Sequence, residues 1–185
     1  MRLTRESILE DVRNYLRVHV EELGVLKPLH DALKEHRHDG DAACDSRCPL
    51  IAVSPVVLDE RDSVLHFFHV PTRSWVLYAD FVEPSTESLA HSAYQILVET
   101  LGMDSVWLPP QPQPPLLIDV STVPGDRNRC IPPRTCYTFR YLFRALSTQL
   151  NCPEFTKFGT KWISIRDVRD SLLRKRIAVA AMRPG

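Results

Sequence analysis

The chain has 185 residues, of which 44% are hydrophobic and 25% charged, a composition typical of one folded domain with a substantial core. Its 23 basic and 23 acidic side chains leave no net charge, so nothing favours a polyanion such as nucleic acid as a partner. No apolar stretch approaches the roughly 18 residues of a membrane span or forms the core of a signal peptide. The five cysteines form no CxxC pair, which favours a reducing, cytoplasmic location.

The N-terminal part of the sequence predicts two helices. Apolar residues at helical spacing indicate a helix over residues 5–23, with Gly24 as its end. Ser7 and Glu10 have the spacing of a capping box, provided that the helix begins slightly later. A second helix is expected over residues 27–37.

Strand-like runs follow the helices. The apolar run over residues 50–58 predicts a buried strand, in which Pro55 favours a bulge or an edge. A polar turn then leads into a return strand over 64–70 and a short strand over 75–79. A helix is expected over 87–101, with Ala90, Ala93, Leu97 and Leu101 on one face and Gly102 at its end. The remaining predicted elements are strands over 116–123, 135–145 and 162–165 and a final helix over 166–182.

One stretch of the sequence resembles a known family signature. Residues 75–103 read WVLYADFVEPSTESLAHSAYQILVETLGM. They resemble the Nudix signature region, in which a Trp-Leu strand and a Gly-Gly-His-Val-Glu-Pro loop lead into a helix written Arg-Glu-x-x-Glu-Glu-x-Gly. Val82, Glu83 and Pro84 stand where the family has its Val-Glu-Pro, and Glu99 and Gly102 match the end of the box.

The surrounding segments resemble the same family in order. Residues 50–57 stand where the first core strand is found, residues 137–144 resemble a late strand, and Trp162 resembles the tryptophan before the closing helix. The resemblance implies an α+β fold, a Nudix-like α/β/α sandwich with a mixed sheet. It places this domain at residues 45–185, after an N-terminal helical extension over residues 1–44.

The resemblance also implies a metal site, which this sequence has largely lost. Nudix hydrolases cleave a diphosphate linkage with Mg²⁺ or Mn²⁺, cations that require several oxygen ligands. The family's glutamates fall on positions 96, 99 and 100, which share one face of an α-helix. Here these residues are Ile96, Glu99 and Thr100, and Gln95 replaces the family's arginine.

A weak, rearranged site remains conceivable. Glu83, Glu87 and Glu99 are the candidate catalytic and metal-binding residues, with Asp80 as a further oxygen ligand or substrate contact. The alternative is that these carboxylates are simply solvated. Trp75 and Tyr141, together with Trp107, are expected either to line a substrate pocket beside the box helix or to pack in the core.

Two further groups have metal-binding or reactive residue types. His36, His38, Cys44 and Cys48 could form a zinc site, but a polar loop without metal is the simpler interpretation. Cys130 and Cys136 flank two prolines at the start of a strand, and both are expected to be unreactive because the sequence offers no activating base.

Two other patterns predict where side chains point. His66 and His69 lie three apart in one strand, so we expect one inside and one outside. The final helix is basic, and its cations, Arg176 among them, are expected on a solvated face, with contact to a phosphate or a partner as the alternative.

Three functions follow from the sequence. The first is a divergent Nudix hydrolase acting on nucleoside-diphosphate-like or other phosphate-containing small molecules with a reduced metal site. The second is a catalytically silent Nudix-fold module that binds a small molecule or a protein. The third is an enzyme of different chemistry in specialised metabolism. In each case the expected ligand is a small molecule, and no nucleic-acid or membrane partner is expected. The sequence leaves open whether the chain is a monomer or a homodimer.

Overall fold

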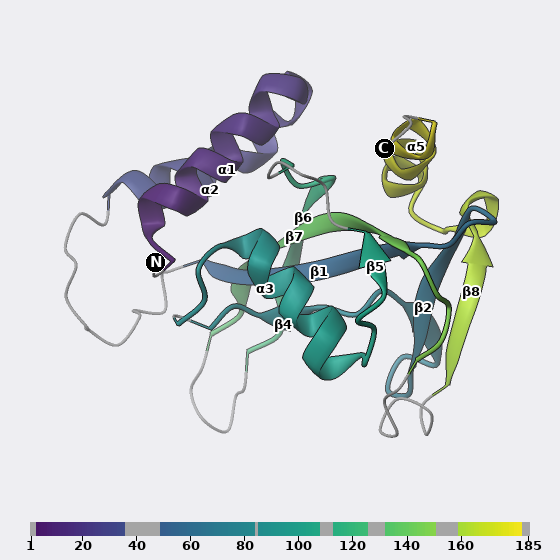
Figure 1. Cartoon of the computed structure of the whole chain (residues 1–185). Coiled ribbons are helices and arrows are strands. Elements are labelled where there is room, and N and C mark those ends of the chain that lie inside the picture. The colour runs from purple at the N-terminus through teal and green to yellow at the C-terminus, as the bar shows by residue number, and fades with distance from the viewer. Residues whose placement is uncertain are drawn as a thin grey trace.

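The computed structural model describes residues 3–35, 49–83, 85–107, 113–125, 132–150 and 159–182. The strands in this part of the chain form one sheet (Figure 1), and they are β1 (Leu50–Leu58), β2 (Ser63–His69), β3 (Ser74–Val76), β4 (Asp80–Phe81), β5 (Val106–Trp107), β6 (Leu117–Val123), β7 (Arg134–Ala145) and β8 (Thr160–Ser164). The helices are α1 (Arg5–Val18), η1 (Val20–Glu22), α2 (Leu23–Glu35), α3 (Leu89–Gln95), η2 (Ile96–Thr100), η3 (Ile165–Asp167) and α5 (Ser171–Ala181). No described helix is long and apolar enough to cross a membrane.

The sheet is mixed, as expected. Its main path runs β3-β2-β1-β7-β5, while β4 pairs with β1, β6 with β7 and β8 with β2. β1 and β7 run parallel along the whole of β1, and the other pairs are antiparallel. On its other side β1 is in register with β4 at Ala52 and Val53 and with β2 at Leu58. Pro55 lies between these paired residues, so on this side of β1 it stands at a local edge, as predicted. The N–H that proline lacks is not needed there for a hydrogen bond to a neighbouring strand.

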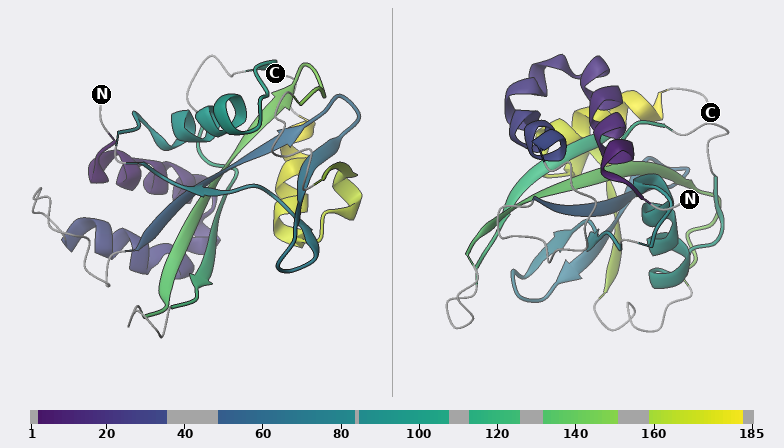
Figure 2. Two further views of the ribbon diagram at one scale, coloured as in Figure 1. Left: turned by 90° about the horizontal axis from the view of Figure 1, so that it is seen from below. Right: turned by 90° about the vertical axis from the view of Figure 1, so that its left-hand side faces the viewer.

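Helices pack against both faces of this sheet, which confirms the predicted α+β sandwich. Neighbouring residues of a strand point to opposite faces. Val53 and Val57 of β1 belong to a core cluster that includes residues of α1, α2 and α3, and Val56 and Leu58 belong to a second cluster with α5. Figure 1 shows α3 lying across β1, and the right-hand view of Figure 2 shows α5 behind the pair α1 and α2.

The N-terminal helices differ from the sequence prediction at their ends. α1 begins at Arg5 because Thr4 and Ser7 form a reciprocal capping box, so the predicted Ser7–Glu10 pairing is wrong. Gly24 does not end a helix either, since it lies in the first turn of α2. The division into an extension over 1–44 and a domain over 45–185 stays a prediction, because residue 44 lies outside the described residues. Residues of both helices nevertheless belong to the main core cluster.

The C-terminal helix begins later than predicted. Residues 165–167 form the 3₁₀ turn η3, and α5 begins at Ser171, where the side chain of Asp170 accepts a hydrogen bond from the N–H of Leu173 at 2.9 Å. The two short strands β4 and β5 were not predicted. Each has only two residues, too few to show a period in the sequence.

Candidate functional site

The helix of the Nudix-like box exists, but its second half is not an α-helix. α3 begins at Leu89, where the Ser88 side chain accepts a hydrogen bond from the N–H of His91, and Gly102 ends the box helix with a φ of 62°. η2 is a π-helix, in which the N–H of Leu101 donates to the carbonyl of Ile96 at 2.9 Å. We call α3 and η2 together the box helix. A π-turn closes hydrogen bonds between residues five apart, so the α-helical spacing rule fails within it.

This geometry corrects the premise that residues 96, 99 and 100 share one face. Ile96 is 7% exposed and packs in the main core cluster. Glu99 is exposed and Thr100 is half-buried. Residue 96, where the resemblance places the first glutamate, therefore faces the core. Glu99, the only carboxylate at these three positions, faces solvent.

The candidate carboxylates do not form a metal site in the described part of the chain. Glu83, Glu87 and Glu99 are all exposed. Asp80 is engaged locally, because its Oδ1 accepts a hydrogen bond from the N–H of Phe81 at 2.8 Å. Among the described residues, no group of three or more His, Cys, Asp or Glu side chains could hold a metal ion. The role of Glu83, Glu87 and Glu99 as catalytic or metal-binding residues stays a prediction.

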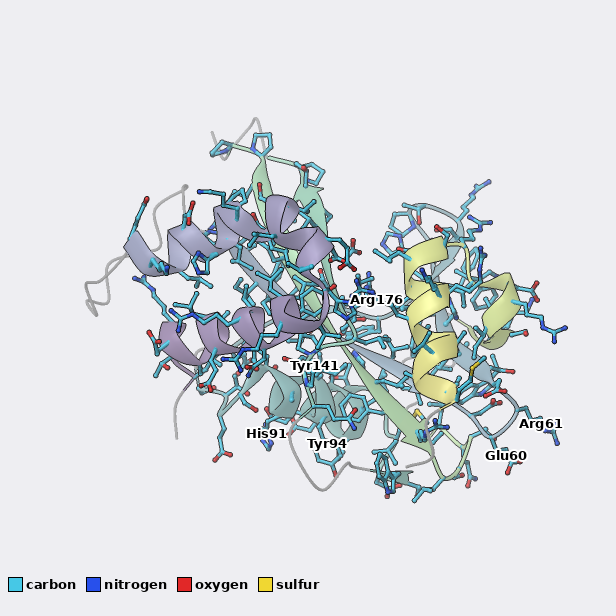
Figure 3. All side chains as sticks on the ribbon, turned by 90° about the horizontal axis from the view of Figure 1, so that it is seen from above. Glu60, Arg61, His91, Tyr94, Tyr141 and Arg176 are labelled. Carbon is cyan, nitrogen blue, oxygen red and sulfur yellow. The ribbon has the colours of Figure 1, made fainter. Side chains whose placement is uncertain are left out.

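The aromatic residues proposed for substrate binding lie in different places. Tyr141 is buried between α1 and α3 (Figure 3), and its hydroxyl donates to Asp11 Oδ2 at 3.4 Å. Burial, followed by the Asp11 charge, raises the pKa of Tyr141 well above its usual value. Trp75 stacks edge-on against Phe68 with ring centroids 5.4 Å apart. The structure does not bring Trp75 and Tyr141 into one pocket, and their role in substrate binding stays a prediction.

Predictions about the other singled-out residues have mixed outcomes. The histidine prediction is confirmed, since His66 is buried with Nδ1 2.9 Å from the carbonyl oxygen of Val64, and His69 is exposed. Cys136 is buried, and burial raises the pKa of its thiol, which agrees with low reactivity. Cys130 and the proposed zinc ligands His36, His38, Cys44 and Cys48 lie outside the described residues.

A pocket of about 520 Å³ lies between the C-terminal end of α1, strand β7 and helix α5. Its lining comes from four regions that are distant in the sequence. We call it the α1–α5 pocket, and it is lined by Tyr15, Val18, His19, Glu21, Trp107, Gln113, Pro114, Pro115, Leu116, Leu142, Arg144, Leu172, Lys175, Arg176, Val179 and Ala180.

Arg176 holds the two helical walls of this pocket together. Its side chain is 8% exposed, pairs with the Glu22 carboxylate and donates a hydrogen bond to the Tyr15 hydroxyl. It also donates to the carbonyl of Leu116 at 3.0 Å. The Tyr15 hydroxyl in turn donates to Glu22 at 2.7 Å, and the Arg176 guanidinium lies 5.1 Å from the centroid of the Tyr15 ring. Figure 3 shows Arg176 between α5 and the pair α1 and α2.

The prediction of a fully solvated basic face on the last helix is therefore wrong for Arg176. The sequence offered no local signal for it, because Arg176 lies 161 residues from Tyr15 and 154 from Glu22. The neighbouring Lys175 does face solvent, as expected. Burial and the Arg176 charge lower the pKa of His19, which favours a neutral imidazole at pH 7.

Comparison with known proteins gives similarity in fold only. No protein-family model and no curated protein matches the sequence. Among solved structures, the chain is similar to the Ap4A hydrolase of C. elegans (14% identity, TM-score 0.48, covering 71% of this chain and 98% of that one). It is also similar to a Nudix-family hydrolase from Clostridium perfringens (17%, 0.45, 72% and 93%). A third similar structure is an ADP-ribose pyrophosphatase from Streptococcus suis (15%, 0.46, 74% and 95%).

Two of these solved structures are named as hydrolases, one of them explicitly of the Nudix family, and the third is named as a pyrophosphatase. At such identities and TM-scores the likeness concerns the fold alone. What this chain does must be argued from its own residues.

Proposed function

We propose that this chain is a Nudix-fold protein that has lost metal-dependent hydrolysis and binds a small molecule in the α1–α5 pocket. The observation that supports this most directly is the position of Ile96. An apolar side chain stands where the resemblance places a metal-binding glutamate, and it packs in the core. In this chain the box helix packs against the core, whereas in the family that the sequence resembles it holds a cation.

The remaining oxygen donors also favour this proposal. Mg²⁺ requires near-octahedral coordination and gives up its bound water reluctantly, so an isolated surface carboxylate binds it weakly. Glu99 is exposed on the box helix, and the described residues contain no cluster of three acidic, histidine or cysteine side chains that could complete a site. The pocket, by contrast, has a volume within the range typical of small-molecule sites.

Calorimetric titration with Mg²⁺ and Mn²⁺ tests the metal part of this proposal. We expect no binding tighter than about millimolar, as ligand number sets the affinity of hard-cation sites. The Glu99→Gln variant should give the same titration as the wild-type protein, because Glu99 belongs to no group of three or more potential ligands among the described residues.

Hydrolysis assays test the catalytic part. We expect no metal-dependent turnover of Ap4A or ADP-ribose above the rate of a heat-inactivated control, with products separated by ion-exchange chromatography. A micromolar cation site that disappears in Glu99→Gln, together with turnover that disappears in the same variant, would contradict the proposal and favour the divergent hydrolase.

A further inference from the structure

The α1–α5 pocket has a chemical character that specifies its ligand. We propose that it binds a small amphipathic anion, with a flat apolar body and a single acidic group such as a carboxylate, phosphate or sulfonate. This inference rests on the proposed function, because it names the ligand class of the same pocket. It makes no use of the box helix.

The apolar body is suggested by the floor and rim of the pocket. Leu142 of β7 and the half-buried Trp107 of β5 line it, and an indole ring offers a flat surface for stacking. At the rim, Val18, Leu172 and Val179 are 64%, 42% and 50% exposed. A ligand seated there would remove these three apolar side chains from water, which favours binding in proportion to the area covered.

The single negative charge is suggested by the balance of charges around the pocket. Arg144, Lys175 and Arg176 line it, while Glu21 is its only lining carboxylate among the described residues. Glu22 lies behind and pairs with Arg176. Three cations therefore face two carboxylates, an excess of one positive charge. His19 does not change this balance, since burial and Arg176 lower the pKa of its imidazole.

Lys175 is the cation best placed to meet the acidic group. Arg176 is committed to Glu22, Tyr15 and Leu116, and Arg144 donates to the carbonyls of Ala180 and Ala181 at the end of α5. Lys175 is exposed, and its side-chain ammonium forms no hydrogen bond or ion pair with any residue in the described ranges. An ammonium at the rim can approach an anion while the apolar body occupies the floor.

The walls of the pocket are fixed before any ligand arrives. Arg176 ties α5 to α1 and η1, and Arg144 ties β7 to the C-terminal end of α5. A pocket with walls held by buried hydrogen bonds loses little conformational entropy on binding. The volume of about 520 Å³ suits a ligand of two or three fused or linked rings more than a folded partner surface.

A pair of naphthalene dyes tests the proposal on the intact protein. We use 8-anilino-1-naphthalenesulfonate as the anionic probe and N-phenyl-1-naphthylamine as its uncharged counterpart, each titrated by fluorescence. The wild-type protein should bind one equivalent of the anionic dye, and more tightly than the neutral dye. Near-ultraviolet circular dichroism must stay unchanged, because loosely packed states also bind the anionic dye.

Three variants separate charge from apolar contact. Lys175→Met should weaken binding of the anionic dye by about three- to fivefold and leave the neutral dye within about twofold, since one exposed ion pair contributes up to about a factor of five. Val179→Asp should weaken both dyes. Val25→Asp is the matched control, because Val25 is also an exposed helical valine but does not line the pocket. It should leave both affinities unchanged.

Several outcomes would overturn the proposal. These are the absence of saturable binding of one equivalent, an equal effect of Lys175→Met on both dyes, or weaker binding in Val25→Asp. A dimer in sedimentation equilibrium that Val179→Asp dissociates would also overturn it, because the rim would then be an interface between two copies. None of these results bears on cation binding by Glu99, so failure here is distinguishable from failure of the metal part of the proposed function. Saturable binding of the neutral dye without a preference for the anionic dye would overturn only the ligand class and leave small-molecule binding in the pocket standing.

Discussion

Replacing Arg176 with methionine should strongly destabilise the protein. The substitution keeps an unbranched apolar stem but removes the guanidinium, which is 8% exposed. Glu22, whose side chain is 14% exposed, would lose its cation, and Tyr15 and the carbonyl of Leu116 would lose hydrogen-bond donors. Removing one partner from a buried ion pair leaves the other charge desolvated and unpaired.

The expected loss follows from that arrangement. Breaking a buried pair from one side costs about 3–5 kcal/mol, and the residual exposure of Glu22 places this case near 3 kcal/mol. For a chain of this length that corresponds to a drop in Tm of roughly 6–12 °C. Urea unfolding followed by circular dichroism measures the free energy of unfolding directly. Lys175→Met is the matched control, since Lys175 is the adjacent exposed cation and its loss should change stability by less than about 0.5 kcal/mol.

A double-mutant cycle with Glu22→Gln tests the cause of this loss. If Arg176 stabilises the fold through Glu22, the double variant should be more stable than the sum of the two single changes predicts, by at least about 1 kcal/mol. A loss below about 1 kcal/mol for Arg176→Met would refute the reasoning. So would strictly additive effects, because they would show that the pair is not formed.

The remaining predictions concern three other positions. Ile96→Glu should destabilise the fold by several kcal/mol in chemical denaturation, because it buries an unpaired carboxylate, and retention of full stability would contradict the packing of Ile96 in the core. Burial, which outweighs the Tyr141 hydrogen bond, raises the pKa of Asp11 to about 6 from 3.8. Folding thus favours the protonated form of Asp11. Protonation therefore adds to the free energy of unfolding, fully below about pH 4, and this added stability is lost as the pH rises through 6. Asp11→Asn should therefore be more stable than wild type at pH 8, by about 1–2 kcal/mol after allowing for solvent, and no more stable at pH 4. Asp170→Ala should cost about 1 kcal/mol through loss of the α5 N-cap, with helix content measured alongside stability.

The elements that the sequence predicted well are those in which local pattern and burial agree. β1 and β7 carry apolar residues through most of their length, because both are buried in the sheet, and their predicted ranges match the observed ones to within one residue. Helix ends were harder to predict. Thr4 sets the start of α1, because its side chain accepts a hydrogen bond from the N–H of Ser7. At the other end α1 stops at Val18, and Gly24, the predicted end, lies inside α2.

The candidate site could be predicted only in part, because its decisive features are not local. The resemblance implies that Ile96 and Thr100 stand where the family has glutamates, but the sequence does not indicate that the chain passes through a π-turn there. The α1–α5 pocket was missed altogether. Its walls meet through Arg176, Glu22 and Tyr15, and no spacing rule connects residues on opposite ends of a chain.

The burial of Ile96 and the π-turn of η2 together limit how the box could be restored. Replacing Gln95, Ile96 and Thr100 with the family's arginine and glutamates would restore the charges of the motif, but the π-turn and core packing would leave Glu99 and the new residue 96 on different faces. A cation site needs its oxygens to converge on one point, and charges on different faces cannot do so. At the position where the resemblance places a ligand, Ile96 gives the core an apolar side chain. For this reason, recovering a metal centre would require the helix itself to repack, whereas the α1–α5 pocket is already built from stable contacts on another part of the fold.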